Sequence, residues 1–236
     1  MMFDCYLLEY LEATDYKRIL HLQQQIRSIK EKKADFPDFL MVLQHNNVFT
    51  LGRNANEANI LVSKQIAKEK GIDIIKVDRG GDVTYHGPGQ LVGYFLLNLT
   101  KLGISIKDFV WKMEEVLIQT LVNFNIIGFR LKGYPGVWVN KDNTLKKIAA
   151  VGARASHMIT SHGVALNVNT DMEFFKLIVP CGIKRYPPTS MRELLGKKVD
   201  MHKVYAFFES AFSAVFNANL KKISEEELSN IISGVV

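Results

Sequence analysis

Apolar and polar positions along the chain form several short runs that each predict a β-strand. The first three are "FDCYLLEYL" at 3–11, "DFLMVLQH" at 38–45 and "NNVFTLGR" at 46–53, which begins with a turn at Asn46-Asn47. The next two are "DIIKVDR" and "LVGYFLLNL", both of strand length and bounded by turn residues. Further on, "GVWV", a lysine-rich turn and "KIAAVGAR" predict a hairpin, and "HGVALNV" predicts another strand.

Helical periodicity appears between and after these runs. Following Thr14, which we expect to be an N-cap, one helix face carries four apolar residues: Ile19, Leu22, Ile26 and Ile29. A short helix closed by Gly71 is predicted within "NEANILVSKQIAKEKGI". The segment 105–126 has a strong helical period through Phe109, Met113, Val116, Leu117, Thr120 and Leu121.

The C-terminal third is predicted to be helical. Its segment "VDMHKVYAFFESAFSAVF" is amphipathic, and Ser224 with Glu227 forms a capping-box pattern ahead of Leu228. No internal repeat, long linker or low-complexity segment divides the chain. These elements predict one mixed α/β (α+β) domain over residues 1–236, with a mixed central sheet flanked by helices.

Composition supports a folded globular protein. Of the 236 residues, 47% are apolar and 23% are charged, a balance unlike that of disordered chains. No apolar run reaches the roughly 18 residues that a membrane span needs, and the N-terminus lacks a basic region followed by a long apolar stretch. We therefore expect a cytoplasmic protein with no membrane association.

The formal charge is +6, from 30 Lys and Arg against 24 Asp and Glu, and it favours an acidic partner. The basic residues are scattered and no stripe of arginines interleaves with aromatics, so we expect no nucleic-acid binding. Cys5 and Cys181 lie far apart in the sequence and, without a secretory signal, are expected to be free thiols. Neither has a second ligand at metal spacing, so we expect no metal site.

The stretch "RGGDVTYHGPGQ", Arg79 to Gln90, combines four glycines with polar and charged residues directly before an apolar strand. Its glycines allow a ligand to approach the backbone, and Pro88 restricts the loop. The spacing fits neither a dinucleotide-binding nor a Walker loop. A tight turn with incidental polar residues fits the composition equally well, and His86 by itself is compatible with a purely structural histidine.

Cys181 lies in "LIVPCGIKRY", between a proline and a glycine and close to Lys184 and Arg185. Cationic neighbours favour the thiolate, which is the nucleophilic form, although a cysteine that fills the core is an open alternative. A partner base or cation is needed. His86, His157 and His162 are candidates by residue type, and so is Lys147, which begins the strand-like "KIAAVGAR" and is predicted to project from a strand packed into the core.

Four motifs in one order resemble those of the lipoyl(octanoyl) transferase family. They are "RGGDVTYHGPGQLVGY", "KIAAVGAR", "SHGVALNVN" and "PCGI", and the similarity runs from about Gln44 to Arg185. The resemblance implies a fold like the catalytic domain of biotin and lipoate protein ligases. It also implies that no cofactor is needed, because a thioester is exchanged for a thioester.

The resemblance assigns roles by motif. Cys181 matches the nucleophile and Lys147 the lysine that works with it. The implied substrate-binding residues are Arg79, Gly80, Gly81, Asp82, Val83, Thr84, Tyr85, His86, Ala150, Val151, Gly152, His162, Gly163, Val164 and Ala165.

The implied reaction moves an octanoyl group from acyl carrier protein to a lysine of lipoyl domains in 2-oxoacid dehydrogenases or of the glycine-cleavage H protein. The early stretch "QHNNVFTLGR" departs from the "EHP" that the family often has, which removes an acidic group there but leaves the Cys–Lys pair untouched. Three alternatives stay open: an ATP-dependent lipoate or biotin ligase of the same fold, a noncatalytic acyl-binding module, and a cysteine hydrolase or thioesterase.

Overall fold

The computed structural model describes residues 2–182 and 185–234, apart from the side chain of Cys181. The strands are β1 (Phe3–Thr14), β2 (Asp38–His45), β3 (Val48–Leu51), β4 (Asp73–Lys76), β5 (Val83–His86), β6 (Gln90–Leu96), β7 (Phe129–Leu131), β8 (Tyr134–Lys141), β9 (Thr144–Ser156), β10 (Ile159–Asn167) and β11 (Ala218–Lys222). The α-helices are α1 (Tyr16–Lys32), α2 (Lys64–Glu69), α3 (Leu99–Leu102), α4 (Ile106–Val122), α5 (Met191–Leu195), α6 (Met201–Phe216) and α7 (Glu225–Ser233). Short 3₁₀ helices are η1 (Glu57–Asn59), η2 (Met172–Leu177) and η3 (Pro180–Gly182).

The strands form two sheets. In the larger one the strand order is β11-β1-β2-β6-β10-β9-β8-β7, and in the smaller one it is β4-β3-β5. The β1–β11 and β1–β2 pairs are parallel, whereas β2, β6, β10, β9 and β8 pair antiparallel in turn. The larger sheet is therefore mixed, as the sequence predicts.

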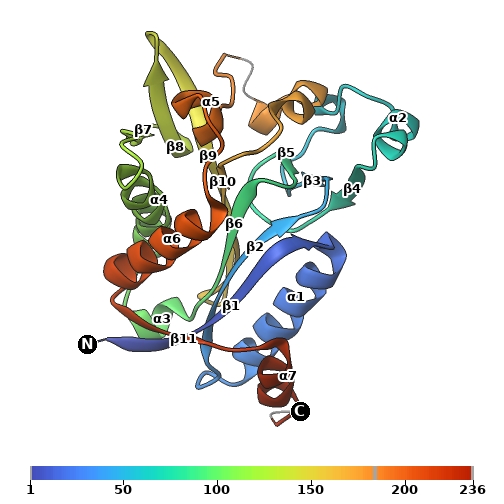
Figure 1. Cartoon of the computed structure of the whole chain (residues 1–236). Helices are drawn as coiled ribbons and strands as arrows, with labels where there is room; N and C mark the ends of the chain where they lie inside the picture. The colour runs from blue at the N-terminus through green and yellow to red at the C-terminus, as the bar shows by residue number, and fades with distance from the viewer. Residues whose placement is uncertain (1, 183–184, 235–236) are drawn as a thin grey trace.

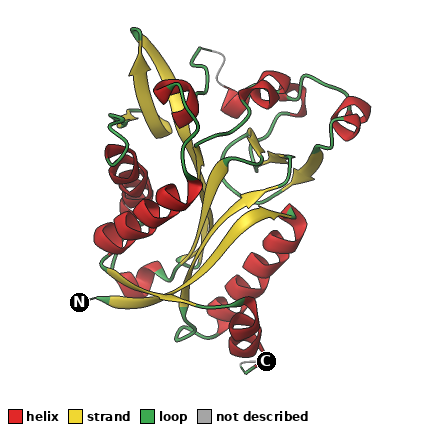
Figure 2. Cartoon of the chain, viewed as in Figure 1, coloured by secondary structure: helices red, strands yellow, loops and turns green. Residues whose placement is uncertain are grey.

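Helices cover both faces of the larger sheet (Figures 1 and 2). On one face α4 and α6 bury a core with Phe95, Phe109 and Phe212, and on the other α1 and α7 bury a second core around Phe39. The smaller sheet packs against η2 in a third cluster. Within the described residues, no helix is long and apolar enough to cross a membrane.

Most sequence expectations for the elements are confirmed. The helix predicted at 105–126 is α4, and all six residues of its apolar stripe are buried. The capping box of Ser224 and Glu227 starts α7. The predicted N-cap Thr14 is wrong by one residue, because Asp15 accepts the Arg18 N–H while the Thr14 hydroxyl donates to the Gln44 carbonyl.

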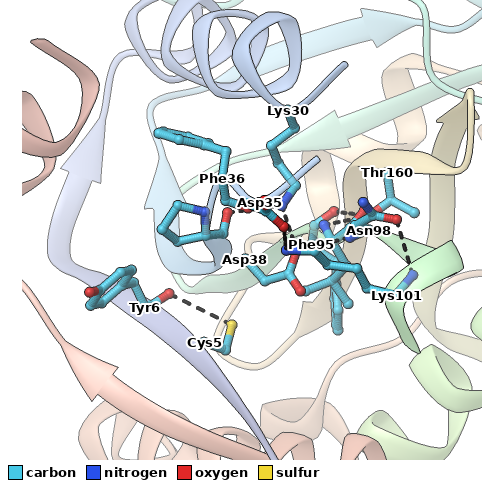
Figure 3. A network of polar contacts seen from close by, with 12 residues as sticks. Cys5, Tyr6, Lys30, Asp35, Phe36, Asp38, Phe95, Asn98, Lys101 and Thr160 are labelled. Carbon is cyan, nitrogen blue, oxygen red and sulfur yellow. Dashed lines mark hydrogen bonds and ion pairs between the residues drawn. The ribbon is translucent and has the colours of Figure 1, made fainter. Parts of the chain in front are cut away.

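A buried ion pair joins the end of α1 to the start of β2 (Figure 3). The Lys30 ammonium donates to Asp38 (2.5 Å) and to the carbonyls of Phe36 and Pro37, and Asp38 also accepts from the Asn98 N–H. Lys30 is only 2% exposed, and burial lowers its pKa although Asp38 opposes the shift. The pair thus ties α1, β2 and the start of α3 together in a region with little water.

Removing the cation should leave the Asp38 carboxylate buried without its counter-charge. We expect Lys30→Met to lower the free energy of unfolding by about 3 kcal/mol, measured by urea denaturation. The control is Lys76→Met, which removes an exposed ion pair with Glu57 and should change stability little. Equal losses in the two variants would contradict a special role for the buried pair.

Candidate active site

Two adjoining cavities open along β9 and β10. They share Thr84, Ala150 and Ala165 in their walls, so we treat them as one cleft. Lys147 lines one of the two cavities and His86 the other. Lys147 also borders a wider groove of about 470 Å³ that runs past Tyr134 and the glycines at 80 and 81.

Two of the predicted substrate-binding motifs form one wall of the cleft. In the antiparallel pairing of β9 with β10, Ala150 lies opposite Ala165, Val151 opposite Val164 and Gly152 opposite Gly163. All six residues border the cleft. Their small size leaves room beside the strands, and the structure thus brings these two motifs side by side.

The glycine loop is shaped by its own arginine. Arg79 is 6% exposed, and its guanidinium donates to the carbonyls of Thr50, Gly80 and Asp82 and to the Thr50 hydroxyl. This arrangement satisfies a buried cation with main-chain oxygens and fixes the loop. Arg79, Gly80 and Gly81 line the cleft, while the Asp82 carboxylate accepts from the N–H groups of Asn56 and Val83.

The second half of this motif is a strand rather than the loop we expected. β5 pairs antiparallel with β3, and its side chains therefore alternate between two environments. Thr84 and His86 face the cleft, whereas Val83 and Tyr85 pack into the core of the smaller sheet. This motif therefore contributes two residues to the lining of the cleft and two to the core of the smaller sheet.

Lys147 is half-buried on β9, and its Nζ lies 5.4 Å from the centre of the Trp138 ring. Its backbone is bonded on both sides: the N–H donates to the Pro187 carbonyl (3.0 Å), and its carbonyl accepts from the Thr189 N–H (2.9 Å). Gly136 gives the side chain room, because a Cβ there would lie 2.6 Å from Lys147 Cε. The neighbouring Lys146 is also half-buried.

The backbone of Cys181 belongs to η3, while its side chain lies outside the described part of the chain. Pro180, immediately before it, lines the same cavity as Lys147 and Tyr186. On the other side Gly182 has φ +68°, and a Cβ there would approach Asp82 to 3.2 Å. The turn that carries Cys181 therefore lies between the glycine loop and the Lys147 end of the cleft.

His86 and His45 are buried and neutral. Burial lowers the pKa of His86 to about 3 and that of His45 to about 4. His86 Nδ1 lies 2.8 Å from Gln90 Oε1, and His45 Nε2 lies 2.8 Å from the Tyr94 hydroxyl. Near neutral pH these rings act as hydrogen-bonding groups without charge.

His162 is held by a carboxylate that the sequence reasoning missed. Its Nε2 lies 2.8 Å from Asp78, which also binds Arg27 (2.9 Å) and Arg154. The hydrogen bond from His162, supported by Arg27, lowers the pKa of Asp78, while burial lowers the pKa of His162 despite the carboxylate. His162 has φ +58°, and within the described residues its Nδ1 has no hydrogen-bond partner.

The third histidine considered from the sequence, His157, has a different setting. It lies exposed in the turn between β9 and β10, with φ +49°. Its Nδ1 is 3.3 Å from the hydroxyl of Ser156. Of the three candidates, His86 and His162 border the cleft.

The family model described as the lipoyl protein ligase A/B catalytic domain matches residues 15–213. The chain belongs to this family. An octanoyltransferase of Caldicellulosiruptor saccharolyticus is 43% identical over 225 residues, which cover 94% of each chain. One of Koribacter versatilis is 43% identical over 209 residues, covering 87% of this chain and 82% of that protein. The protein is thus an acyltransferase.

Solved structures of the lipoyl ligase family share the fold. A bipartite lipoate protein ligase of Thermoplasma acidophilum gives a TM-score of 0.73 at 16% identity, covering 100% of this chain and 92% of that one. A lipoate-protein ligase A bound with ATP gives 0.68 at 18% identity, covering 100% and 94%. The expected ligase-like architecture, with its mixed sheet flanked by helices, is therefore confirmed.

Two further residues shape the candidate site without having been predicted. Gly136 accommodates Lys147, and a glycine inside the strand run "YPGVWV" was the available signal. Asp78 orients His162 from the end of "DIIKVD", where no local pattern marks it. Among the side chains that the structure describes, which exclude that of Cys181, no three His, Cys, Asp or Glu residues are grouped to bind a metal ion.

The buried histidines predict an acid-sensitive stability. In the unfolded chain a histidine takes up a proton below its ordinary pKa of 6.5, whereas folded His86 stays neutral down to about pH 3. Stability should therefore fall as pH drops below 6.5. Between about pH 7.5 and pH 5, His86→Gln should reduce this loss by about 2 kcal/mol in chemical denaturation.

The control for this measurement is the same change at His202, which is exposed on α6. It should keep the pH dependence of the unmodified enzyme. A His86→Gln variant with an unchanged slope would show that the folded ring takes up a proton as readily as the unfolded one.

Proposed function

We propose that this acyltransferase moves an octanoyl group from acyl carrier protein to a lysine of lipoyl domains through a thioester on Cys181. The acceptors would be lipoyl domains of 2-oxoacid dehydrogenases and the glycine-cleavage H protein, in the cytoplasm. The observation that carries the proposal is the shared cavity of Lys147 and Pro180, the residue before Cys181. The names of the relatives support octanoyl as the acyl group.

The first half-reaction forms the acyl-enzyme. The Lys147 ammonium stabilises the Cys181 thiolate, which attacks the thioester carbonyl. The bond between that carbonyl carbon and the carrier's sulfur breaks, and the carrier leaves as a thiol with a proton from Lys147. Because one thioester replaces another, no ATP is consumed.

The second half-reaction restores the enzyme. The acceptor lysine amine attacks the acyl-enzyme carbonyl, and the now neutral Lys147 takes the proton that the amine loses. The carbon–sulfur bond to Cys181 breaks, which returns the thiolate and the ammonium. Pocket residues around Ala150–Gly152 and Gly163–Ala165 would hold the octanoyl chain, with Arg79 to His86 shaping the opposite side.

Intact-mass analysis tests the covalent step directly. After incubation with octanoyl-acyl carrier protein, the wild-type enzyme should gain one octanoyl group that hydroxylamine removes. Added apo lipoyl domain should discharge the enzyme and gain the same mass. Cys181→Ser should form no thioester, whereas Cys5→Ala is the matched control, since Cys5 is buried and its pKa is raised by burial.

Each of the alternative functions gives a different result in this assay. Modification of the lipoyl domain by the Cys181→Ser variant with ATP and free octanoate would identify a ligase. Free octanoate as the main product would identify a thioesterase. A complex that never acquires covalent octanoate would identify a binding module.

The role of Lys147 can be separated from that of its neighbour. Lys147→Ala should slow both half-reactions at least 100-fold or so, the usual scale for loss of an acid–base group, in rapid-quench measurements. Lys146→Ala changes an adjacent half-buried lysine on the same strand and should keep rates near wild type. Unchanged rates in Lys147→Ala would remove this lysine from the chemistry.

A further inference from the structure

A chain of buried amides runs along the cleft, where Gln90 and Asn167 line the same cavity as Lys147. His86 Nδ1 donates to Gln90 Oε1 (2.8 Å), and Gln90 Nε2 donates to Asn167 Oδ1 (2.8 Å). Asn167 Nδ2 then donates to the carbonyl of Thr189 (3.0 Å). Gln90 is 1% and Asn167 5% exposed, so water offers these groups little alternative bonding.

The chain ends on the segment that holds Lys147. Residues 187–189, which we call the strap, bracket Lys147 through the bonds of Pro187 and Thr189 to its N–H and carbonyl. Pro188 between them forms a parallel bridge with Lys147. Thr189 is fully buried, and its carbonyl receives the Asn167 amide while its N–H faces Lys147.

The strap also follows the turn that carries Cys181. Tyr186, the residue before the strap, packs edge-on against Trp138 (5.4 Å between ring centres), the ring that lies beneath the Lys147 ammonium. At its other end the Thr189 hydroxyl donates to Glu193 of α5 (2.8 Å). The Asn167 bond is the link from this segment to β10, the strand that forms the wall of the cleft.

We propose that Asn167, oriented by Gln90, is a positioning residue that sets the spacing between Lys147 and the Cys181 turn by holding the strap against β9. This inference rests on the proposed pairing of the Lys147 ammonium with the Cys181 thiolate. Without the Asn167 amide, the buried Thr189 carbonyl loses its donor and the strap relaxes away from its place. Because the attraction of the two charges falls with distance, the thiolate is then less favoured.

The other ionisable groups that share a cavity with Lys147, among the described residues, are Tyr134, Arg154 and Tyr186. His86 connects to the strap through the amide chain and is neutral. The test leaves all four unchanged. Asp82, which lies close to Gly182 beside Cys181, is also unchanged. A change in the titration of Cys181 therefore reports the geometry of the Cys–Lys pair.

The experiment measures the alkylation of Cys181 by iodoacetamide as a function of pH, in a Cys5→Ala background. When Asn167 is present, the pH midpoint of Cys181 alkylation should lie well below the ordinary cysteine pKa of about 8.5. Asn167→Leu, similar in size but unable to hydrogen-bond, should raise the midpoint by about one pH unit. It should also lower kcat about tenfold or more, with little change in KM for octanoyl-acyl carrier protein.

Thr160→Val is the matched control on the same strand. Thr160 is fully buried and donates to the Phe95 carbonyl, so this variant should lose stability while keeping the midpoint and kcat. If Asn167→Leu does not fold, Gln90→Leu should shift the midpoint in the same direction by a smaller amount, because it removes the group that orients the Asn167 amide.

A low midpoint that both amide-chain variants retain, with unchanged kcat, would overturn the positioning role alone. A wild-type midpoint near the ordinary value would overturn the proposed ammonium–thiolate pair and this inference with it. The proposal is supported if the midpoint of Asn167→Leu is raised while that of Thr160→Val equals the wild-type midpoint.

Discussion

The backbone pairing of β9 is the constraint on which the site depends. Along one part of its length β9 pairs with β10, which sets Ala150–Gly152 against Gly163–Ala165. Beyond Ala149, β10 no longer pairs with β9. The 187–189 strap instead forms hydrogen bonds with both the N–H and the carbonyl of Lys147. A single strand thereby aligns the small-residue wall, the candidate lysine and the segment that follows the candidate cysteine. A shift of one residue would turn every one of these side chains to the other face.

The buried histidines around the wall are held without charge. Burial keeps His45 and His86 neutral, and the guanidinium of Arg79 is surrounded by main-chain oxygens. His162 is neutral as well and is oriented by Asp78. In our account these rings therefore shape and line the space, and the proton transfers of the proposed reaction fall to Lys147.

Much of the fold follows from periodicity in the sequence. The long amphipathic helices α4 and α6 and the hairpin of β8 and β9 each carry a repeated pattern over many residues. β5 was missed because its four residues lie between glycines and look like part of a loop. β11 was missed because its sequence "ANLKK" is largely polar. It forms by parallel pairing with β1 at the edge of the sheet, a contact that the local sequence pattern does not predict.

The candidate site, like the fold, is predicted only in part by the sequence. Residue types and motif resemblance predict Lys147, Cys181 and the small residues of the wall as site residues, but the sequence does not reveal which of them lie close together. The split of Val83 to His86 between core and cleft needed the strand assignment. Asp78 and Asn167 form hydrogen bonds with partners distant in the chain, His162 and Thr189, so sequence spacing does not predict these contacts.

The central claim is that one sulfur and one amine share the cleft with the acyl chain. A crystal structure of the octanoyl-enzyme tests it most directly. Our account predicts Cys181 Sγ within about 4 Å of Lys147 Nζ, close enough for thiolate and ammonium to pair once the acyl group has left, with the octanoyl chain along Ala150–Gly152 and Gly163–Ala165. A sulfur directed to solvent, with the chain bound away from this wall, would contradict it.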